Sequence, residues 1–371
     1  MENGLIRARN YILEKKYKWI LKPILFKLDP EKVHDTMNLI GRILGKFRIT
    51  KVASSMLWGY SDPSLEQKIL GINFKNPVGL SAGFDKNAEL TDIIPSVGFG
   101  FMEVGSVTGE NCLGNPKPRL WRLKKSESLA VYYGLANDGS EAIAERLAKK
   151  KFSIPVGINI AKTNCKETVD TKNATEDYFK VYRAFARIGD YYTINISCPN
   201  TFGGQPFNDK NKLDALLKKI MSVPKTKPIF LKLSPDLDQK GADEIIEIAD
   251  KWKIDGFICA NLTKKRDSKK ILDKSVPNLG GLSGKALNNL SDKMIKYIYQ
   301  KTKGKFIIMG VGGIFRAEDA YKKIKAGASL VQLITGMIFE GPQLISDINL
   351  GLVKLLQKDG YKNISEAIGR C

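Results

Sequence analysis

The chain has 371 residues, 43% of them hydrophobic, and a formal net charge of +21 at pH 7. This apolar content excludes a disordered chain and suffices for one large α/β barrel with an additional segment. Five cysteines without a C-x-x-C pair and a single histidine, His34, exclude a zinc ribbon, a disulfide framework and a multi-histidine metal centre, so no metal is expected. The basic residues form no long block, which favours a solvated surface, and no nucleic acid is expected as a partner.

Residues 1–50 differ in pattern from the rest of the chain. An apolar stretch from Trp19 to Leu28 is followed by Asp29-Pro30-Glu31, which is typical of a helix start. Charged residues interrupt the region where a secretory signal would lie, and no apolar run reaches the roughly 18 residues of a membrane-spanning helix. Two amphipathic helices rich in Lys and Arg predict an anchor on a membrane surface, whereas a helical hairpin packed on its own domain fits the periodicity equally well.

From about residue 74 onward, short apolar runs alternate with helical patterns. Eight runs suit buried parallel strands, namely Pro77–Ser81, Phe99–Gly105, Ile154–Ile160, Tyr191–Ile196, Pro228–Leu233, Gly256–Ala260, Phe306–Gly310 and Leu330–Ile334. Helical patterns separate most of them, for example Ser140–Lys150, Lys212–Met221, Gly241–Lys253 and Ala317–Ala326. Eight such units in series predict an α/β fold of the (β/α)8 TIM-barrel type, since an open doubly wound sheet would carry G-x-G-x-x-G after its first strand. The predicted domains are a helical extension over residues 1–50 and a barrel over residues 51–371.

In such a barrel, the residues directly after each strand surround the active site. Here they include Lys86, Ser106, Asn159, Lys162, Asn195, Asn200, Lys232 and Asn261. Glycine-rich turns at residues 310–313 and 335–336 expose backbone N–H groups where barrels often bind phosphate. Together these groups suit a planar, hydrogen-bonding ligand that carries a phosphate, and they predict a barrel that binds flavin mononucleotide (FMN).

Two residues at this mouth carry the predicted chemistry. Lys232 would stabilise negative charge on a reduced flavin, or else form an ion pair with Asp236. Cys198 lies in the stretch INISCPNT, in a loop between two asparagines, without the neighbours that a metal ligand needs. This position favours a general base over a buried inert thiol.

Several stretches together resemble the dihydroorotate dehydrogenase family, in its order and spacing, from about residue 20 to the C-terminus. They are FKNPVGLSAGFDKNAE, GFGFMEVGSVT, GNPKPRLWRL, INISCPNT, GGLSGKAL, GVGGI and AGASLVQL. The stretch LFKLDPEKVHDT resembles the helical extension of the membrane-associated, quinone-dependent class, although that class usually has serine at position 198 and cysteine marks the soluble class. The resemblance implies FMN as the cofactor, dihydroorotate and orotate as substrate and product in pyrimidine biosynthesis, and a membrane quinone as electron acceptor. It also favours peripheral membrane association through residues 1–50, on the cytoplasmic side in a bacterium.

The resemblance further implies which residues contact each ligand. FMN would be bound by Ala82, Gly83, Lys86, Ser106, Asn159, Asn195, Lys232, Ala260, Gly284, Gly313, Ile334 and Thr335. The substrate would be bound by Lys86, Val131, Gly134, Leu135, Asn137, Asn195, Asn200, Asn261 and Leu262. Cys198 would remove the C5 proton while the C6 hydride passes to the flavin, and His34 and Arg119 would face the quinone.

The chain departs from the family pattern around the substrate. The family's substrate loop resembles N-R-x-G-F-N, but Val131 and Ala136 replace its two asparagines here, and Asn137 would substitute for one of them after a shift of one residue. Leu262 stands in place of a threonine, and Ile334 in place of a tyrosine on the quinone side. These changes leave open a second hypothesis, a flavin oxidoreductase of the same fold that acts on another dihydropyrimidine or an enoate. The remaining alternatives are a basic flavoprotein that binds nucleic acid and a catalytically inactive protein on a membrane surface.

Overall fold

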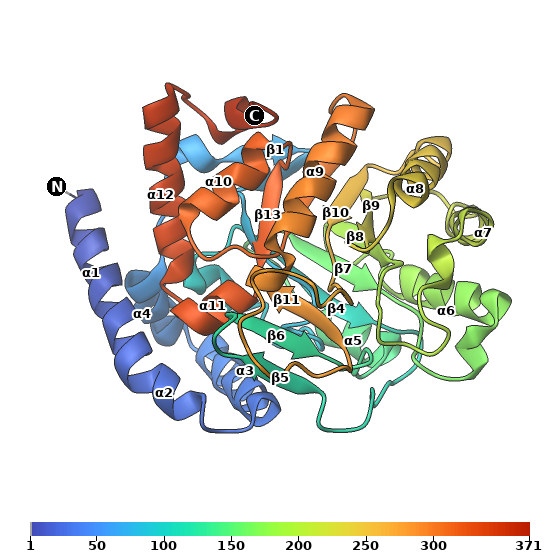
Figure 1. Ribbon diagram of the computed structural model, residues 1–371, viewed down its shortest axis with the longest axis horizontal. Coiled ribbons are helices and arrows are strands. Elements are labelled where there is room, and N and C mark those ends of the chain that lie inside the picture. The colour runs from blue at the N-terminus through green and yellow to red at the C-terminus, as the bar shows by residue number, and fades with distance from the viewer. Residues whose placement is uncertain (1) are drawn as a thin grey trace.

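Eight parallel strands close into a barrel in the computed structural model, which describes residues 2–371 (Figure 1). In chain order the barrel strands are β3 (Val78–Leu80), β4 (Phe101–Val107), β7 (Val156–Ile160), β8 (Tyr191–Asn195), β9 (Ile229–Leu233), β10 (Gly256–Cys259), β12 (Ile307–Val311) and β13 (Leu330–Leu333). The predicted TIM barrel is confirmed, and each predicted strand matches an observed one to within two residues at either end. The strands are continuous apolar runs because helices cover the outside of the barrel and side chains fill its interior.

Helices surround the barrel on its outer face. They are α5 (Ser140–Leu147), α6 (Thr171–Ala184), α7 (Lys210–Ile220), α8 (Gln239–Lys251), α9 (Asn288–Thr302), α10 (Ala317–Lys325), α11 (Thr335–Glu340) and α12 (Leu344–Asp359). Single 3-10 turns lie at η2 (Pro63–Leu65), η3 (Ile94–Val97), η4 (Glu167–Val169), η5 (Pro206–Asn208), η6 (Lys285–Leu287) and η7 (Ile364–Ala367). The four predicted helical patterns correspond to α5, α7, α8 and α10.

Two small antiparallel sheets cap the ends of the barrel, and neither was predicted. A hairpin of β1 (Gln67–Ile69) and β2 (Ile72–Phe74) closes the N-terminal end, where Ile69 and Phe74 join a buried cluster with Phe101, Tyr191 and Phe230. A three-stranded sheet of β5 (Leu120–Leu123), β6 (Ser128–Val131) and β11 (Gly281–Gly284) lies at the opposite end. The second sheet covers the C-terminal end of the barrel, at which the barrel strands end.

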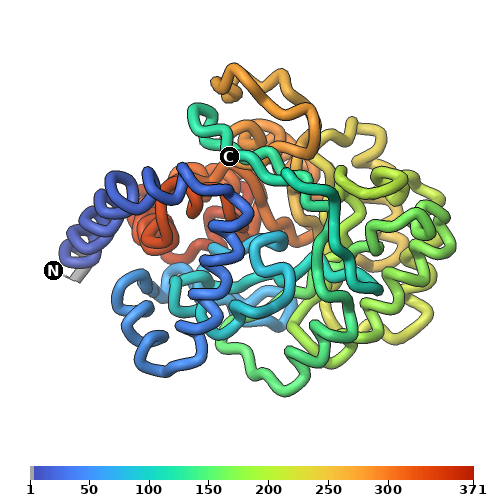
Figure 2. Tube along the Cα trace, turned by 90° about the horizontal axis from the view of Figure 1, so that it is seen from below, coloured from blue at the N-terminus to red at the C-terminus, as the bar shows by residue number. Residues whose placement is uncertain are grey.

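The N-terminal segment is helical and packs along one side of the barrel. It comprises α1 (Glu2–Lys16), the π-helical turn η1 (Tyr17–Leu21), α2 (Lys22–Leu25), α3 (Pro30–Lys46) and α4 (Arg48–Trp58). Figures 1 and 2 show α1 next to the C-terminal helix α12, where the Asn10 amide donates to the Asp347 carboxylate at 2.7 Å. The predicted start of α3 is confirmed, since the Asp29 carboxylate accepts from the Lys32 amide at 2.9 Å.

The helices continue to Trp58, past the predicted boundary at residue 50. Among the described residues, no helix combines the length and apolar character needed to cross a membrane.

Candidate functional site

A cavity of about 1250 Å³, including its open entrance, lies at the C-terminal mouth of the barrel between the barrel strands, the β5–β6–β11 sheet and α3. Most residues predicted for a site line it. They are His34, Ala82, Gly83, Lys86, Ser106, Val131, Gly134, Leu135, Asn195, Cys198, Asn200, Lys232, Ala260, Asn261, Leu262, Gly284, Gly313, Ile334 and Thr335. Ala136, the other altered position of the loop, lines it as well.

Three residues predicted to contact a ligand lie outside the lining, as does Lys162, which was predicted at the mouth. Asn159 lies behind Ser106, whose hydroxyl donates to the Asn159 amide oxygen. Arg119 forms an ion pair with Glu31 at 2.8 Å, and its guanidinium lies 5.1 Å from the centre of the Tyr133 ring.

Asn137 is the third, and the expectation that it reaches the substrate is wrong in this structure. Its amide nitrogen donates to the Thr108 hydroxyl and to the Leu135 carbonyl, both at 2.8 Å. An antiparallel bridge to Cys112 fixes its backbone, and only 5% of the residue is exposed. A shift of one residue therefore does not restore the missing asparagine.

Hydrogen-bonded amides form one wall of the cavity. The Asn195 amide nitrogen donates to the Ser106 hydroxyl at 3.0 Å, and its oxygen accepts from the Asn261 amide at 3.1 Å. The Asn200 amide nitrogen donates to the Val131 carbonyl at 2.8 Å, which leaves its oxygen to accept from a ligand. Because each amide is held by a neighbour, the wall presents fixed hydrogen-bonding groups to a ligand.

Two buried lysines carry charge into the cavity. The Lys86 ammonium lies 3.9 Å from the centre of the Tyr133 ring, and burial lowers the pKa of Lys86 to about 8. Lys232 is 4% exposed, its ammonium lies 3.4 Å from the Ser81 hydroxyl, and burial lowers its pKa as well. No carboxylate of the described residues lies within 4.0 Å of either ammonium. The alternative ion pair of Lys232 with Asp236 is wrong, since the Asp236 carboxylate accepts from the Thr263 hydroxyl and the Lys264 amide. Two buried cations that form no direct ion pair suit an anionic or electron-rich ligand.

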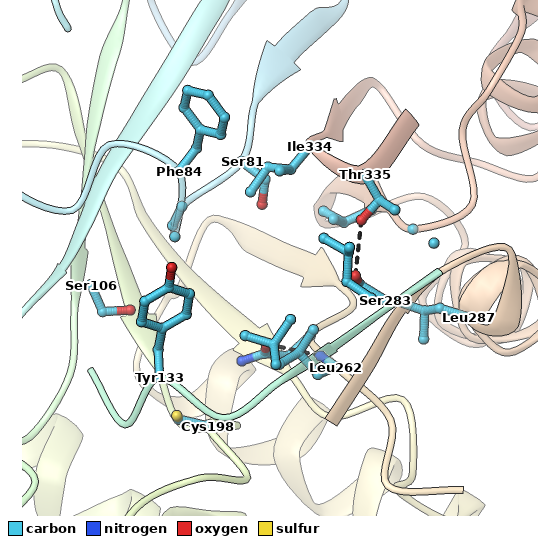
Figure 3. A pocket seen from close by; sticks show the side chains of 18 of the residues that line it. Ser81, Phe84, Ser106, Tyr133, Cys198, Leu262, Ser283, Leu287, Ile334 and Thr335 are labelled. Atoms are coloured by element: carbon cyan, nitrogen blue, oxygen red, sulfur yellow. Dashed lines mark hydrogen bonds between the residues drawn. The ribbon is translucent and has the colours of Figure 1, made fainter. Parts of the chain in front are cut away.

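Cys198 lies in the cavity wall below Tyr133 in Figure 3. Burial raises the pKa of its thiol to about 11, an effect that the Asn200 backbone amide and the charges of Lys162 and Lys232 partly oppose. The Lys162 ammonium holds the adjacent loop by donating to the Phe202 carbonyl at 2.8 Å. Cys198 is therefore a free thiol at neutral pH, in contact with the cavity and with positive charge nearby.

The rings of His34, Phe84 and Tyr133 lie between the inner cavity and α3. The His34 ring nitrogen Nε2 lies 2.9 Å from the Phe84 carbonyl oxygen, which can only accept, so this nitrogen carries the hydrogen. Burial lowers the pKa of His34, followed by the charge of Lys86. The Tyr133 hydroxyl is buried without a hydrogen-bond partner among the described residues, and in Figure 3 it points away from Cys198 toward the loop that carries Phe84. A ligand entering from the α3 side would meet this unpaired hydroxyl.

The opposite wall is built from glycine backbone. Gly284 and Gly313 have φ of +81° and +71°, and an added Cβ would lie 2.5 Å from the Glu127 carbonyl oxygen and 2.4 Å from Asn288 Cβ, respectively. Both positions therefore require glycine, because the neighbouring chain packs against them, and both line the cavity. The Thr335 hydroxyl lies 2.9 Å from that of Ser283 at the same wall (Figure 3).

The cavity thus joins a glycine-lined end to an amide and lysine wall. This donor set fits the phosphate and the polar ring edge of FMN, and the two buried ammonium groups suit its negative charge.

At three positions the cavity has an apolar side chain where the family pattern has a polar one. The side chains of Val131, Ala136 and Leu262 line it beside the amides, and Leu262 occupies the centre of the wall in Figure 3. No side-chain hydrogen bond is available from these three positions.

Sequence reasoning missed several residues of the lining, among them Ser81, Tyr133, Ser283 and Leu287. Ser81 is the last residue of the predicted strand Pro77–Ser81 and Leu287 the last of the stretch GGLSGKAL, so both lie in segments that were identified but not assigned to the site. Tyr133 and Ser283 lie on or beside the β5–β6–β11 sheet, whose pairing between β6 and β11 joins residues about 150 positions apart. No local pattern indicates such a pairing.

Comparison with known proteins agrees with this geometry. The family model described as dihydroorotate dehydrogenase matches residues 64–356. A protein from Christiangramia forsetii named dihydroorotate dehydrogenase (quinone) is 43% identical over 350 residues, covering 92% of this chain and 99% of its own length. One of the same name from Haloarcula marismortui is 38% identical over 94% of this chain and 98% of its own length. The crystal structure of DHODH in complex with ferulenol from Eimeria tenella has a TM-score of 0.81 and 32% identity, covering 92% of this chain and 95% of its own. The chain belongs to the dihydroorotate dehydrogenase family.

Proposed function

We propose that the protein is a quinone-dependent dihydroorotate dehydrogenase, which oxidises (S)-dihydroorotate to orotate with FMN and passes the electrons to a quinone in pyrimidine biosynthesis. The observation that carries the proposal is the single cavity in which Lys86, Asn195, Cys198, Asn200 and Asn261 surround a pocket with Lys232 and a glycine-lined end. The relatives that share this fold over more than nine tenths of the chain support the quinone as acceptor.

The residues of the cavity would divide the work of binding. Gly284, Gly313 and Thr335, which line the cavity, would hold the phosphate end of FMN, and Ser106 and Lys232 would contact its ring. FMN, when bound, supplies the acceptor for the hydride from substrate C6. The positive charge of Lys232 stabilises the negative charge that the transfer brings into a buried site.

Substrate binding uses groups that the protein leaves unpaired. The Lys86 ammonium pairs with the substrate carboxylate, and the Asn200 amide oxygen accepts from a ring N–H. Asn195 and Asn261 would hold the substrate ring in place by hydrogen bonds. Such positioning converts a bimolecular encounter into a preorganised step.

Cys198 is the general base for the proton at substrate C5. Its sulfur takes the proton, the C5–H electron pair forms the C5–C6 double bond, and the C6–H pair leaves as hydride. Two electrons and two hydrogens leave dihydroorotate, and the thiol then releases its proton to solvent. The raised pKa of Cys198 makes the sulfur a strong base once it is ionised.

Anaerobic mixing of the purified protein with dihydroorotate tests this function. The flavin absorption should bleach, and an added ubiquinone analogue should restore it. A yellow protein that dihydroorotate leaves oxidised would refute the proposal.

A second candidate function rests on the apolar positions. With Val131, Ala136 and Leu262 in the lining and Asn137 engaged elsewhere, the pocket lacks hydrogen-bond partners that a polar pyrimidine uses. An unpaired polar group costs roughly 1–3 kcal/mol. A reduced pyrimidine or enoate with a less polar edge avoids that cost. Bleaching by such a compound with no response to dihydroorotate, together with no inhibition by orotate, would favour this function.

We also propose that the N-terminal segment binds a membrane surface. Trp19, Ile24 and Ile49 are 72%, 57% and 78% exposed. Further exposed apolar side chains on the same segment are Leu5, Ile12, Ile20, Leu21, Leu28, Met37, Leu39, Ile40, Ile43, Phe47, Val52, Met56 and Leu57. Helices with such a face and many lysines lie in the interface of a bilayer. Because His34 of α3 lines the cavity, a quinone could pass from this surface to the flavin, and the protein would be peripheral to the membrane, on the cytoplasmic side in a bacterium.

A further inference from the structure

A carboxylate lies in the barrel one layer below the cavity wall. Phe101, Tyr191 and Phe230 face the interior at the N-terminal end of the barrel, where they pack in one buried cluster. Side chains alternate along a strand, so the residues two positions further on also face inward. These residues are Glu103, Thr193 and Lys232. Glu103 is 0% exposed and does not line the cavity.

Glu103 accepts hydrogen bonds at both oxygens. Oε1 accepts from the Thr193 hydroxyl at 2.6 Å, and Oε2 accepts from the Asn159 amide nitrogen at 3.3 Å. A carboxylate has no hydrogen to donate, so Asn159 must turn its nitrogen toward Glu103 and its oxygen away from it.

The orientation of Asn159 determines which atom donates in the next hydrogen bonds toward the cavity. The Asn159 oxygen accepts from the Ser106 hydroxyl, which uses the only hydrogen of that hydroxyl. Ser106 therefore accepts from the Asn195 nitrogen at 3.0 Å. The Asn195 oxygen in turn accepts from Asn261 at 3.1 Å. Glu103 thus sets the direction of the bonds through Asn159 and Ser106, and the Ser197 backbone amide, which donates to the Asn195 oxygen at 3.3 Å, favours the same orientation of Asn195.

Glu103 also provides negative charge for Lys232. The groups that bear on the Lys232 ammonium are the Ser81 hydroxyl at 3.4 Å, the Cys198 thiol and the Glu103 side chain, which is the only carboxylate among them. Burial lowers the pKa of Lys232, and Glu103 is the largest opposing influence. A buried ammonium without that opposing charge would lose its proton at lower pH.

We propose that Glu103 is a positioning residue of the flavin site, which fixes the direction of the hydrogen bonds through Asn159 and Ser106 to Asn195 and supplies a counter-charge to Lys232 from the same inward-facing layer of the barrel. The inference rests on the proposed function, because that function places FMN in the cavity. Glu103 itself touches neither cofactor nor substrate and acts through the residues above it.

The Glu103→Gln variant tests this role, because it removes the charge and allows the amide chain to reverse while it keeps the shape. The FMN affinity of the apoprotein is measured by quenching of flavin fluorescence. The FMN midpoint potential of the holoenzyme is measured against pH by dithionite titration. We expect the Kd for FMN to rise by about tenfold or more. The plot of midpoint potential against pH should change slope where Lys232 loses its proton, and we expect this bend to shift to a pH lower by at least about one unit.

Asp292→Asn is the matched control. The Asp292 carboxylate pairs at 2.5 Å with Lys323, which is 0% exposed and lies on the outer helices away from the cavity. This variant removes a buried carboxylate from a buried lysine and should change neither the FMN affinity nor the pH at which the potential bends.

A folded Glu103→Gln variant with wild-type FMN affinity and an unmoved bend overturns the inference. If that variant does not fold, Thr193→Val serves instead, since it removes one donor to Glu103 and keeps the charge. We then expect about a fivefold weaker FMN affinity with the bend in place, and wild-type affinity overturns the inference. Neither titration uses dihydroorotate. If dithionite reduces the wild-type holoenzyme but dihydroorotate does not, the proposed function is refuted. The inference about Glu103 is not affected by that result.

Discussion

The ammonium of Lys86 lies 3.9 Å from the centre of the Tyr133 ring, and the Arg119 guanidinium lies 5.1 Å from that centre. Arg119 is neutralised by Glu31 at 2.8 Å, whereas Lys86 has no carboxylate within 4.0 Å among the described residues. One ring thus contacts a paired cation, Arg119, and an unpaired cation, Lys86, of which Lys86 lines the cavity. The unpaired cation is the one that a substrate carboxylate can bind.

The first prediction concerns the pH dependence of substrate binding. Burial lowers the pKa of Lys86 to about 8, so its ammonium is charged below that pH and loses its proton as the pH rises through it. The KM for dihydroorotate should therefore be lowest below about pH 8 and rise above it. Lys86→Met should raise the KM at neutral pH by about tenfold or more and remove the pH dependence.

Steady-state kinetics between about pH 6.5 and about pH 9.5 provide the measurement. Lys150→Met is the control, since Lys150 pairs with Asp92 on the surface and lies outside the cavity. A KM that is flat with pH in the wild type and unchanged in Lys86→Met would contradict the assignment.

The second prediction concerns the base. Burial raises the pKa of Cys198 to about 11, so the thiolate fraction grows about tenfold per pH unit below that value, and anaerobic flavin reduction should accelerate accordingly. Cys198→Ala should slow reduction by about 10²–10⁴-fold, and Cys198→Ser should retain part of the rate. Stopped-flow absorbance at the flavin band measures both effects. Cys112→Ala, a buried cysteine outside the cavity, is the control. Unchanged reduction in Cys198→Ala would show that another group takes the proton.

The barrel and most of its mouth were predictable because the strands are buried on both faces. A strand such as Tyr191–Asn195 is wholly buried, so it appears in the sequence as an uninterrupted apolar run that ends where polar residues begin. The polar residues after each strand then meet at one end of the barrel for geometric reasons alone.

The parts that were not predictable depend on contacts between distant segments. The strands β5, β6 and β11 have four residues each, and β11 pairs with a segment about 150 residues earlier. Glu103 was overlooked because it lies within its strand, before the end at which functional residues are sought. Asn137 was misplaced because its bridge to Cys112, which fixes the register of the loop, has no local signature.

The third prediction tests the substrate at its altered positions. Leu262→Thr places a hydroxyl in the cavity where the family pattern has one. If dihydroorotate is the substrate, one additional hydrogen bond should raise kcat/KM about fivefold. Leu287→Thr, at the same cavity but beside Gly312, is the matched control and should not raise it. A fall in kcat/KM for dihydroorotate in Leu262→Thr would instead favour the second candidate function, in which the leucine contacts an apolar edge of the substrate.

The fourth prediction concerns the membrane surface. Trp19 and Ile24 are 72% and 57% exposed on consecutive helical turns, and cations lie beside them, since the Lys15 ammonium is 5.1 Å from the Trp19 ring. Burying such side chains in a bilayer is worth roughly 1.5–3 kcal/mol each. Replacing both with glutamate should therefore weaken binding to phosphatidylglycerol-containing vesicles by at least about 100-fold in a co-sedimentation assay.

Both substituted positions point outward, so flavin content and dihydroorotate oxidation with a soluble dye should stay at wild-type levels in the Trp19→Glu, Ile24→Glu variant. Leu272→Glu provides the control, because Leu272 is 62% exposed but lies far along the chain, in the loop before β11. Equal loss of vesicle binding in the control would show that added negative charge, and not the helical face, governs the attachment. Retained binding in the double variant would mean that the N-terminal segment does not hold the protein at the membrane, and that the quinone reaches His34 by another route.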